Sequence, residues 1–323
     1  MSKIYTALLS ILLLITCLIA IRYIRTLSTP ATYTIGILQT ASHPALDAVC
    51  KGFVEELHKK FGNTVSWSVF NAQGSIAQAH VIAQQLYTHS GYSAFFTIGT
   101  PATQAMSALE KKRPIIIAAV TDPHALGIMG PEGNVCGVQD MIDVVATVDM
   151  VTLILPQAKN IGLLYTAGEA NSRIVAHALS VELQKRYIQT ADYVAHHETD
   201  IPILVESACK NVDAILAPTD HMVAATIPLL VARTHACKKP FIVSDNLLVK
   251  YGPLAACGVD YYESGKRAAE ITCDILVHNK KPHAIPLEKA QGGTMVMNKD
   301  TMTMLHISIP AQLEQSIIFV EQE

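Results

Sequence analysis

Charged and aromatic side chains are scarce in this sequence of 323 residues. Only 16% of the residues are charged, and 24 basic residues nearly balance 27 acidic ones. Without a basic block, the chain lacks the positive field that attracts nucleic acid, so no nucleic-acid partner is expected. Aromatic residues make up 6%, with a single tryptophan, Trp67. Half of the residues are nevertheless apolar, which excludes a disordered chain, and roughly 100–200 residues per domain predicts two domains.

Motifs for metal, nucleotide and hydrolytic chemistry are also missing. The seven cysteines form no CxxC pair, and the 13 histidines form no HExxH motif. There is no Walker motif and no GxSxG, and the glycines of GIMGPEG (127–133) have the wrong spacing for a dinucleotide loop. We therefore expect no metal and no cofactor. Six cysteines lie beyond the N-terminal region; they are either buried thiols or, in an exported chain, disulfides whose pairing the spacing leaves open.

One long apolar run is present at the N-terminus. Residues 4–21 contain no charge, with Lys3 before them and Arg22 after them. Such a run predicts a secretory signal or a membrane anchor within residues 1–30. The three residues before Cys17 loosely resemble a bacterial lipobox, which makes lipidation of Cys17 one alternative beside cleavage near Ala31 or an uncleaved anchor. The protein is then expected in the periplasm or at the outer face of the cytoplasmic membrane.

After this segment, short apolar runs alternate with amphipathic stretches. Strands are predicted at 34–40, 65–73, 93–100 and 113–123, and helices at 44–62, 76–89 and 102–112. Strands that alternate with helices predict a parallel sheet covered by helices on both faces.

The pattern then repeats. Ile35, Gly36 and Leu38 recur as Ile161, Gly162 and Leu164, at an offset of 126 (161 − 35 = 126). The RPIII run at 113–117 and the KPFIV run at 239–243 share this offset, while 95–105 matches 214–224 at an offset of 119 and places Thr100 opposite Thr219. The sequence therefore predicts an α/β protein made of two similar Rossmann-like lobes.

Polar residues follow the predicted strands in both lobes. Ligands of parallel sheets bind beyond the carboxyl ends of the strands, so the loops of two facing lobes should line one cleft. The candidate ligand-binding residues are Gln39, Asn71, Thr100, Thr121 and Asp122 in the first lobe, and Tyr165, Asn171, Ser172, Thr219, Asp220 and Asp245 in the second. Hydroxyls and helix N-termini suit a carboxylate and the aspartates suit an ammonium, which points to an amino acid, with Tyr165 available to stack on an aromatic side chain. The alternative is that Ser, Thr, Asn and Asp here only cap helices.

At these loops the sequence resembles a known family. The matching runs are IGILQTASHPALDAVCKGF (35–53), FNAQGS (70–75), IGTPATQA (98–105), AAVTDP (118–123), GNVCGVQD (133–140), PQAKNIGLLYTAGEANS (156–172), VDAILAPTDHMVA (212–224), IVSD (242–245) and GPLAACGVDYYESGKRAAE (252–270). They resemble the ABC-transporter substrate-binding proteins of the tryptophan/tyrosine-uptake type, which have the type 1 periplasmic-binding-protein fold. The chain departs from that pattern at His221, where the family commonly has Asn, and in TAGEANS, where it commonly has NPGEANS.

The resemblance implies an exported protein that closes by a hinge on a small ligand, in particular an amino acid, and delivers it to an ABC permease with its ATPase. It places lobe 1 at 33–153 plus 253–283 and lobe 2 at 154–252 plus 284–323. A membrane-tethered sensor of the same fold is an alternative. A two-lobed enzyme is a weaker one, because racemases of this shape place a Cys in each lobe where this chain has Thr100 and Thr219.

Overall fold

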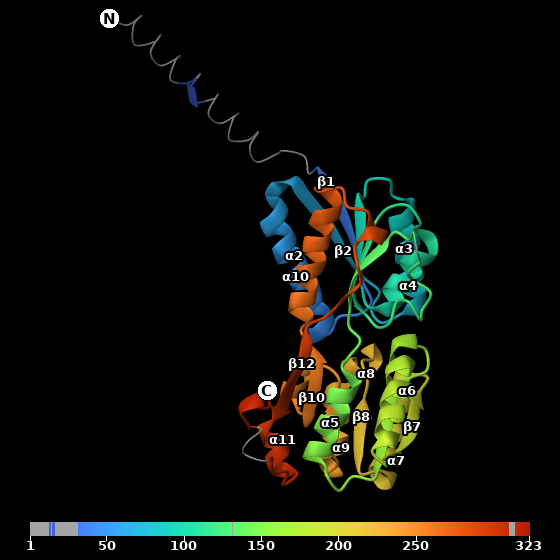
Figure 1. Cartoon of the computed structure of the whole chain (residues 1–323), viewed down its shortest axis with the longest axis vertical. Helices are drawn as coiled ribbons and strands as arrows, with labels where there is room; N and C mark the ends of the chain where they lie inside the picture. The colour runs from blue at the N-terminus through green and yellow to red at the C-terminus, as the bar shows by residue number, and fades with distance from the viewer. Residues whose placement is uncertain (1–12, 14, 17–31, 131, 310–313) are drawn as a thin grey trace, which may run out of the picture.

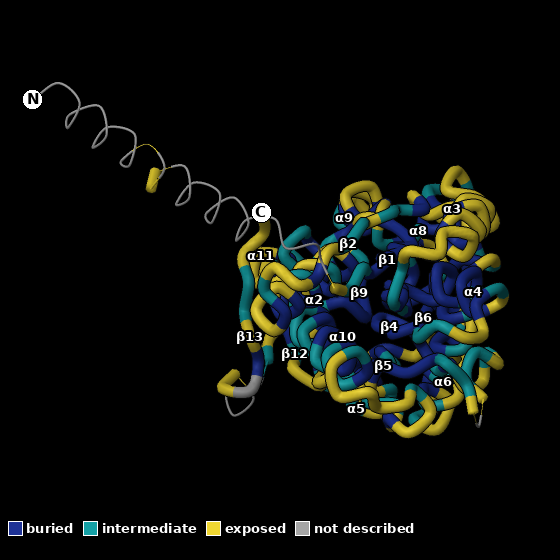
Figure 2. The backbone as a smooth tube through the Cα atoms, turned by 90° about the horizontal axis from the view of Figure 1, so that it is seen from above, coloured by how far each residue is buried: buried dark blue, intermediate teal, exposed yellow. Residues whose placement is uncertain are grey.

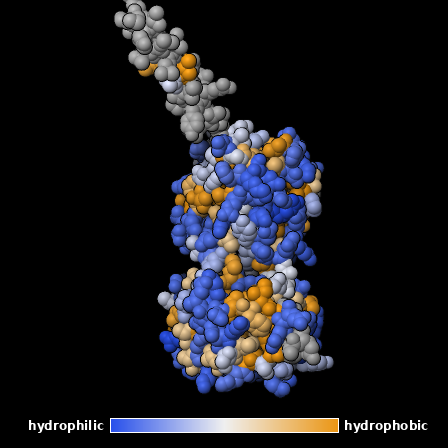
Figure 3. All heavy atoms as spheres, turned by 90° about the vertical axis from the view of Figure 1, so that its left-hand side faces the viewer, coloured by the Kyte–Doolittle hydropathy of each residue, from blue (hydrophilic) through white to orange (hydrophobic). Residues whose placement is uncertain are grey.

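The computed structural model describes residues 13, 15, 16, 32–130, 132–309 and 314–323. From residue 32 onward the described residues form two lobes stacked along the long axis of the molecule (Figure 1), and the space-filling view shows a waist between the lobes (Figure 3). Cys17, Ala31 and most of the apolar run at 4–21 lie outside the described residues. None of the helices in the described part of the chain has the length and apolar character needed to cross a membrane.

The first lobe is built on a six-stranded parallel sheet with the strand order β11-β5-β4-β3-β1-β2. Its strands are β1 (Tyr33–Gln39), β2 (Val65–Asn71), β3 (Ala94–Ile98), β4 (Ile115–Val120), β5 (Val135–Gln139) and β11 (Glu288–Lys289). One face of the sheet is covered by α2 (Pro44–Phe61) and α10 (Tyr261–Leu276), and the other by α3 (Ile76–Thr88) and α4 (Thr100–Leu109).

The second lobe has a seven-stranded sheet with the order β13-β12-β10-β9-β8-β6-β7, in which only the β10–β12 pair is antiparallel. The strands are β6 (Asn160–Thr166), β7 (Gln189–Ala195), β8 (Ala214–Ala217), β9 (Phe241–Val243), β10 (Ala255–Val259), β12 (Gly292–Asn298) and β13 (Ile317–Val320). The helices are α5 (Val144–Ile154), α6 (Ala170–Lys185), α7 (Ile201–Asn211), α8 (His221–Ala225), α9 (Ile227–Ala236) and α11 (Lys299–Met304). The predicted α/β architecture with two parallel-sheet lobes is confirmed.

Burial on both faces explains why the central strands read as continuous apolar runs. Every residue of β4, Ile115–Val120, is buried, as a parallel strand between two helical layers requires. In β1, Ile35 and Ile37 pack beneath α2 and α10 while Leu38 packs beneath α3 and α4. Figure 2 shows the resulting buried interior beneath exposed loops and outer helix faces. Two hydrophobic layers therefore fix each sheet and hold its strand ends in place.

The two lobes exchange their last helices. After β5 in the first sheet the chain crosses over and α5 packs against α6 and β10, and after β10 in the second sheet it returns and α10 packs against α2. A third crossing joins β11 to β12. The crossings thus lie near 140–143, at 260 and at 290–291, instead of the boundaries at 153/154, 252/253 and 283/284 implied by the resemblance. Each crossing occurs where a strand ends: at the first two the helix that follows belongs to the other lobe, and at the third the strand β12 does.

The internal repeat is visible in the strand pairing. In the first sheet Ile35 pairs with Ala94, and in the second Ile161 pairs with Ala214. If Ile35 corresponds to Ile161, then their pairing partners Ala94 and Ala214 also correspond, at an offset of 120 (214 − 94 = 120). This offset is one residue more than the 119 read from the sequence. Thr100 is therefore equivalent to Asp220 instead of Thr219.

Two glycines let α2 and α10 touch through their backbones. A Cβ atom added to Gly52 of α2 would lie 2.2 Å from the carbonyl oxygen of Tyr262, and one added to Gly265 of α10 would lie 2.1 Å from the carbonyl oxygen of Val49. Any side chain at either position would collide with the backbone of the facing helix. The close crossing depends on both glycines.

The six described cysteines are free thiols, among which Cys136, Cys209 and Cys257 are buried. Burial raises the pKa of Cys136 to about 12, so this thiol stays protonated at neutral pH.

Candidate functional site

The carboxyl ends of strands from both sheets meet around a small inner cavity between the lobes. Its volume is about 30 Å³, room for about one or two water molecules. From lobe 1 it is lined by His43, Ala45, Leu46, Ala119, Asp140 and Tyr261, and from lobe 2 by Asn171, Ala217, Pro218, Thr219, Asp220, His221, Val223, Ala224, Val243, Ser244, Asp245 and Leu248. This is the position that the topology of two facing parallel sheets predicts for a ligand.

Three buried aspartates line this cavity, and burial raises the pKa of two of them, Asp245 and Asp140. The Oδ1 atom of Asp245 accepts a hydrogen bond from the backbone of Leu247 at 2.9 Å, while its Oδ2 atom is buried without a partner. Burial raises the pKa of Asp245 to about 7. Asp140 follows β5, and burial likewise raises its pKa, although its carboxylate accepts a bond from the Thr121 hydroxyl at 2.7 Å. A cation entering the cavity would favour the ionised form of both groups.

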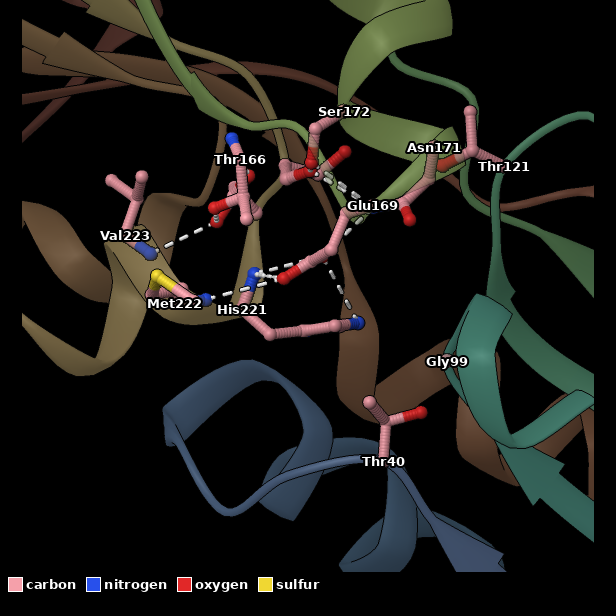
Figure 4. Close-up of polar contacts among 12 residues, drawn as sticks. Thr40, Gly99, Thr121, Thr166, Glu169, Asn171, Ser172, His221, Met222 and Val223 are labelled. Atoms are coloured by element: carbon pink, nitrogen blue, oxygen red, sulfur yellow. Dashed lines mark hydrogen bonds and ion pairs between the residues drawn. The ribbon is translucent and has the colours of Figure 1, made fainter. Parts of the chain in front are cut away.

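Glu169 holds the start of α8 from the neighbouring loop. Its carboxylate accepts hydrogen bonds from the backbone N–H groups of His221, at 3.1 and 3.2 Å, and Met222, at 3.3 Å (Figure 4). Burial, and then the negative charge of Asp220, raise the pKa of Glu169 to about 8. Glu169 therefore carries a proton through much of the neutral range and fixes the backbone that presents His221.

A pair of histidines joins the two lobes at this point. The Nε2 atom of His43, just before α2, lies 3.0 Å from the Nδ1 atom of His221, the first residue of α8. Burial, and then the neighbouring His221, lower the pKa of His43 to about 3. The pKa of His221 is also lowered by burial, against the opposing charges of Asp220 and Asp140. Both rings are therefore neutral at pH 7, so one donates and the other accepts.

Several buried polar atoms around the cleft have no hydrogen-bond partner among the described residues. They are His43 Nδ1, Thr100 Oγ1, Asn171 Oδ1, Thr219 Oγ1, His221 Nε2 and Asp245 Oδ2. Buried polar groups are normally paired because leaving one unpaired costs about 1–3 kcal/mol. Their concentration at one place, from both lobes, indicates groups that a ligand pairs.

A larger outer cavity of about 470 Å³ lies on the other side of His221. Lobe 1 contributes Thr40, Ala41, Ser42, Gln73, Gly74, Ile76 and Pro101, and lobe 2 contributes Thr166, Gly168, Glu169, His196, Glu198, His221, Met222 and Ala225. The cleft therefore has two compartments, and His221 lines both.

The structure gives Asp220 and Ser172, predicted as ligand contacts, strong bonds within lobe 2. The Asp220 carboxylate accepts bonds from the Thr166 backbone at 2.7 Å, the Thr166 hydroxyl at 2.8 Å and the Val223 backbone at 2.9 Å. The Ser172 hydroxyl donates to the carbonyl of Thr219 at 2.8 Å. These two residues position the loops, and only Asp220 also lines the cavity.

We expect Asp220→Ala to lower the free energy of unfolding by about 2–4 kcal/mol, because it removes a helix cap and leaves the Thr166 N–H unpaired. Urea unfolding followed by circular dichroism measures this. Asp143 provides the matched control, since its carboxylate accepts a single capping bond, from Ala146 at 2.9 Å, and Asp143→Ala should cost about 1 kcal/mol. Equal costs for the two variants would contradict the structural role of Asp220.

The predicted site residues divide into three groups. Asn171, Thr219 and Asp245 line the inner cavity beside Asp220, while the buried Thr100 begins α4 with its hydroxyl unpaired. Thr121 acts through Asp140. The remaining four, Gln39, Asn71, Asp122 and Tyr165, lie outside both cavity linings. Gln39 donates a hydrogen bond to Asp47 at 2.6 Å, and Tyr165 lies near Asp192. Asn71 and Asp122 accept hydrogen bonds from the backbones of Gln73, at 2.7 Å, and Ala125, at 3.0 Å.

Several residues of the site that carry its chemistry were not selected from the sequence, among them His43, Asp140, Glu169, His221 and Tyr261. Glu169 and His221 lie inside the runs GEANS and PTDH, and Asp140 is the last residue of the run GNVCGVQD, directly after β5. Position after a strand was therefore the available signal. His43 comes four residues after β1, beyond the loop considered.

In the part of the chain that the structure describes, no three His, Cys, Asp or Glu side chains are placed to hold a metal ion. The described residues that line the inner and outer cavities include no lysine and no arginine. Acidic groups without basic partners make the cleft suited to a ligand that carries positive charge.

Comparison with known proteins agrees with this arrangement. The sequence profile of the family described as ABC transporter substrate binding protein matches residues 34–317. A tyrosine-binding protein from Clostridioides difficile (strain R20291) is 30% identical over 278 residues, which cover 84% of this chain and 80% of that protein. The chain therefore belongs to the ABC transporter substrate-binding proteins, a family of binding proteins with the type 1 periplasmic-binding-protein fold.

Two solved structures show the same architecture. An ABC domain from Streptococcus pneumonia in complex with L-Trp has a TM-score of 0.84 and 27% identity, covering 88% of this chain and 99% of that chain. The ligand-free, open structure of a substrate binding protein with adhesive properties from Clostridium difficile has a TM-score of 0.69 and 28% identity, covering 90% of this chain and 100% of that chain.

Proposed function

We propose that this chain is the exported solute-binding component of an ABC importer, that it binds an amino acid between its lobes, and that it delivers this ligand to a membrane permease and its ATPase. An aromatic amino acid is the first candidate. The relatives support this choice, because one is a tyrosine-binding protein and another was solved with L-Trp.

One observation carries the proposal. Unpaired polar atoms of both lobes converge on the same cavity: the histidine ring of His43 from lobe 1, and the side chains of Asn171, Thr219 and Asp245 from lobe 2. A ligand that pairs these atoms contacts both lobes only when they are closed. Since only contacts that differ between open and closed states shift their populations, such a ligand stabilises closure.

The charges favour one orientation of an amino acid. Its ammonium group would bind the free Oδ2 atom of Asp245, with Asp140 adding negative charge nearby. Its carboxylate would accept hydrogen bonds from hydroxyls such as that of Thr219, and from the N-terminal end of α4 at Thr100. Its side chain would extend toward the outer cavity.

Size supports extension into the outer cavity. Sites for small molecules usually measure about 300–1,000 Å³, so the inner cavity of about 30 Å³ is too small for a whole aromatic amino acid. The whole chain also superposes better on the L-Trp complex than on the open, ligand-free relative, with TM-scores of 0.84 and 0.69, which supports a closed arrangement of the lobes. Binding then requires opening, entry and renewed closure around a larger volume.

The test is a binding panel with the purified protein from residue 32 onward. We expect L-Tyr, L-Trp or L-Phe to raise the melting temperature and to give a saturable heat by isothermal titration calorimetry, while N-acetyl-L-Tyr, which lacks the ammonium, should not bind. If all twenty amino acids leave both signals unchanged, the amino-acid assignment is wrong. Binding of N-acetyl-L-Tyr equal to that of L-Tyr would exclude the role given to Asp245.

A further inference from the structure

The histidine pair occupies a special place in the cleft. The hydrogen bond between His43 and His221 links a side chain of lobe 1 to a side chain of lobe 2. Away from the chain crossings, no other side-chain hydrogen bond between described residues does so. The two rings lie 5.3 Å apart between centroids. His221 lines the inner and the outer cavity, while His43 lines the inner one. The pair therefore lies where the two compartments adjoin.

The backbone of lobe 1 is shaped to accept this closure. Gly99, before α4, has φ of 91°, a left-handed conformation that favours glycine. A Cβ atom at this position would lie 2.6 Å from the Thr40 hydroxyl oxygen and 3.2 Å from the Nε2 atom of His221. Figure 4 shows the His221 side chain extending from the start of α8 toward the part of lobe 1 that carries Thr40 and Gly99. His221 thus reaches across the cleft into a space that a larger residue would fill.

The chemistry of the pair is the same in either tautomeric arrangement. Two neutral imidazoles sharing one hydrogen bond use one N–H and one lone pair, and keep one of each. The spare atoms are His43 Nδ1 and His221 Nε2, both buried without a partner; the nearest carboxylate oxygen of Glu169 is 3.9 Å from His221 Nε2, beyond hydrogen-bonding distance. When the rings separate, the two atoms of the broken bond again need one donor and one acceptor.

We propose that the His43–His221 pair is a gate that the ligand must displace, and that it selects a ligand whose far end both donates and accepts hydrogen bonds, such as a phenolic hydroxyl. This inference rests on the proposed function, because it assumes that the head group of an amino acid lies in the inner cavity. A hydroxyl inserted between the rings replaces both halves of the lost bond. An apolar side chain leaves two buried ring nitrogens unpaired, which a polar site penalises strongly.

Selection is tested with L-Tyr and L-Phe, which differ by one hydroxyl. In calorimetry we expect the protein to bind L-Tyr at least about tenfold more tightly than L-Phe. His221→Ala should reduce this preference to about threefold or less, while His221→Asn, which keeps a donor and an acceptor, should retain most of it. His177→Ala, on the exposed surface of α6, is the matched control and should leave the preference unchanged. Equal affinities in the unmodified protein, or an unaltered preference in His221→Ala, would overturn the selection.

The gate itself is tested without ligand. Small-angle X-ray scattering should show a larger radius of gyration for His221→Ala than for the unmodified protein. Loss of one hydrogen bond between the lobes should raise the ratio of open to closed molecules about five- to tenfold. His177→Ala should scatter like the unmodified protein, and circular dichroism confirms that each variant is folded. A folded His221→Ala variant as compact as the unmodified protein would refute the gate. If no amino acid binds, the proposed function fails and the selection with it, whereas the scattering result still decides whether the pair holds the lobes together.

Discussion

Asp245→Asn should make the ligand-free protein more stable at pH 8 and at the same time lower its affinity for an amino acid by at least about 30-fold. The carboxylate is buried, and its Oδ2 atom has no partner among the described residues. Asparagine keeps the oxygen that caps Leu247 and removes the ionisable group. It also removes the negative charge that would pair with the ligand's ammonium.

The pH dependence follows from the direction of the shift. Burial raises the pKa of Asp245 from 3.8 to about 7 in the folded protein, so between these values the folded state holds a proton that the unfolded state has lost. The stability from this group is fully present below pH 3.8 and is lost as the pH rises to about 7. The gain from Asp245→Asn should therefore be about 2–3 kcal/mol larger at pH 8 than at pH 5.

Thermal unfolding at the two pH values, with calorimetry for the ligand, measures both effects. Asp213 is the opposite control, because backbone bonds from Lys159 and Asn160 lower its pKa, so Asp213→Asn should lose stability at pH 8. An Asp245→Asn variant that melts lower at pH 8 and binds as tightly as the unmodified protein would contradict both parts of the prediction.

Gly52→Ala should destabilise the first lobe by about 3 kcal/mol or more. Alanine gains about 1 kcal/mol over glycine in helix propensity, yet its Cβ would lie 2.2 Å from the Tyr262 carbonyl oxygen, so α2 and α10 must move apart. That separation opens the apolar layer in which Phe53 and Ile271 are completely buried. Gly265→Ala, with its 2.1 Å contact to Val49, should act in the same way.

The midpoint of urea unfolding measures this cost. Gly130→Ala is the matched control, since a Cβ atom there meets no other atom within 4 Å. Its free energy of unfolding should stay within about 0.5 kcal/mol of that of the unmodified protein. Should Gly52→Ala prove as stable as Gly130→Ala, the helices do not cross at the described distance.

The sequence was sufficient for the architecture because the strands are simple. Runs such as Ile115–Val120, buried throughout, alternate with amphipathic helices, and this alternation has essentially one parallel solution. The repeat at 126 then predicted two lobes. The resemblance placed α10 with lobe 1 but left α5 there as well, because a pattern of apolar residues shows that a helix has a buried face and does not show which sheet it covers.

The site was predicted at the level of loops and less well at the level of side chains. Asp220 and Asp245 have the same residue type and both follow a strand, but Asp220 is surrounded by three N–H or O–H donors, whereas Asp245 keeps one oxygen free toward the cavity. Tyr165 lies on β6 with its hydroxyl near Asp192, outside both cavity linings. Which way a strand-end side chain points depends on packing that a sequence pattern does not contain.

The exchanged helices also govern the order in which the chain becomes stable. The apolar face of α2 is covered by α10, which ends at Leu276, so the first lobe lacks one of its layers until most of the chain has been synthesised. A ribosome-bound fragment that stops at β5 would leave uncovered the side of α2 that faces α10, where Val49 and Gly52 contact α10 through their backbones in the finished protein. We therefore expect the first lobe to become stable only once α10 has been made, and such a delay would suit the export proposed for this chain.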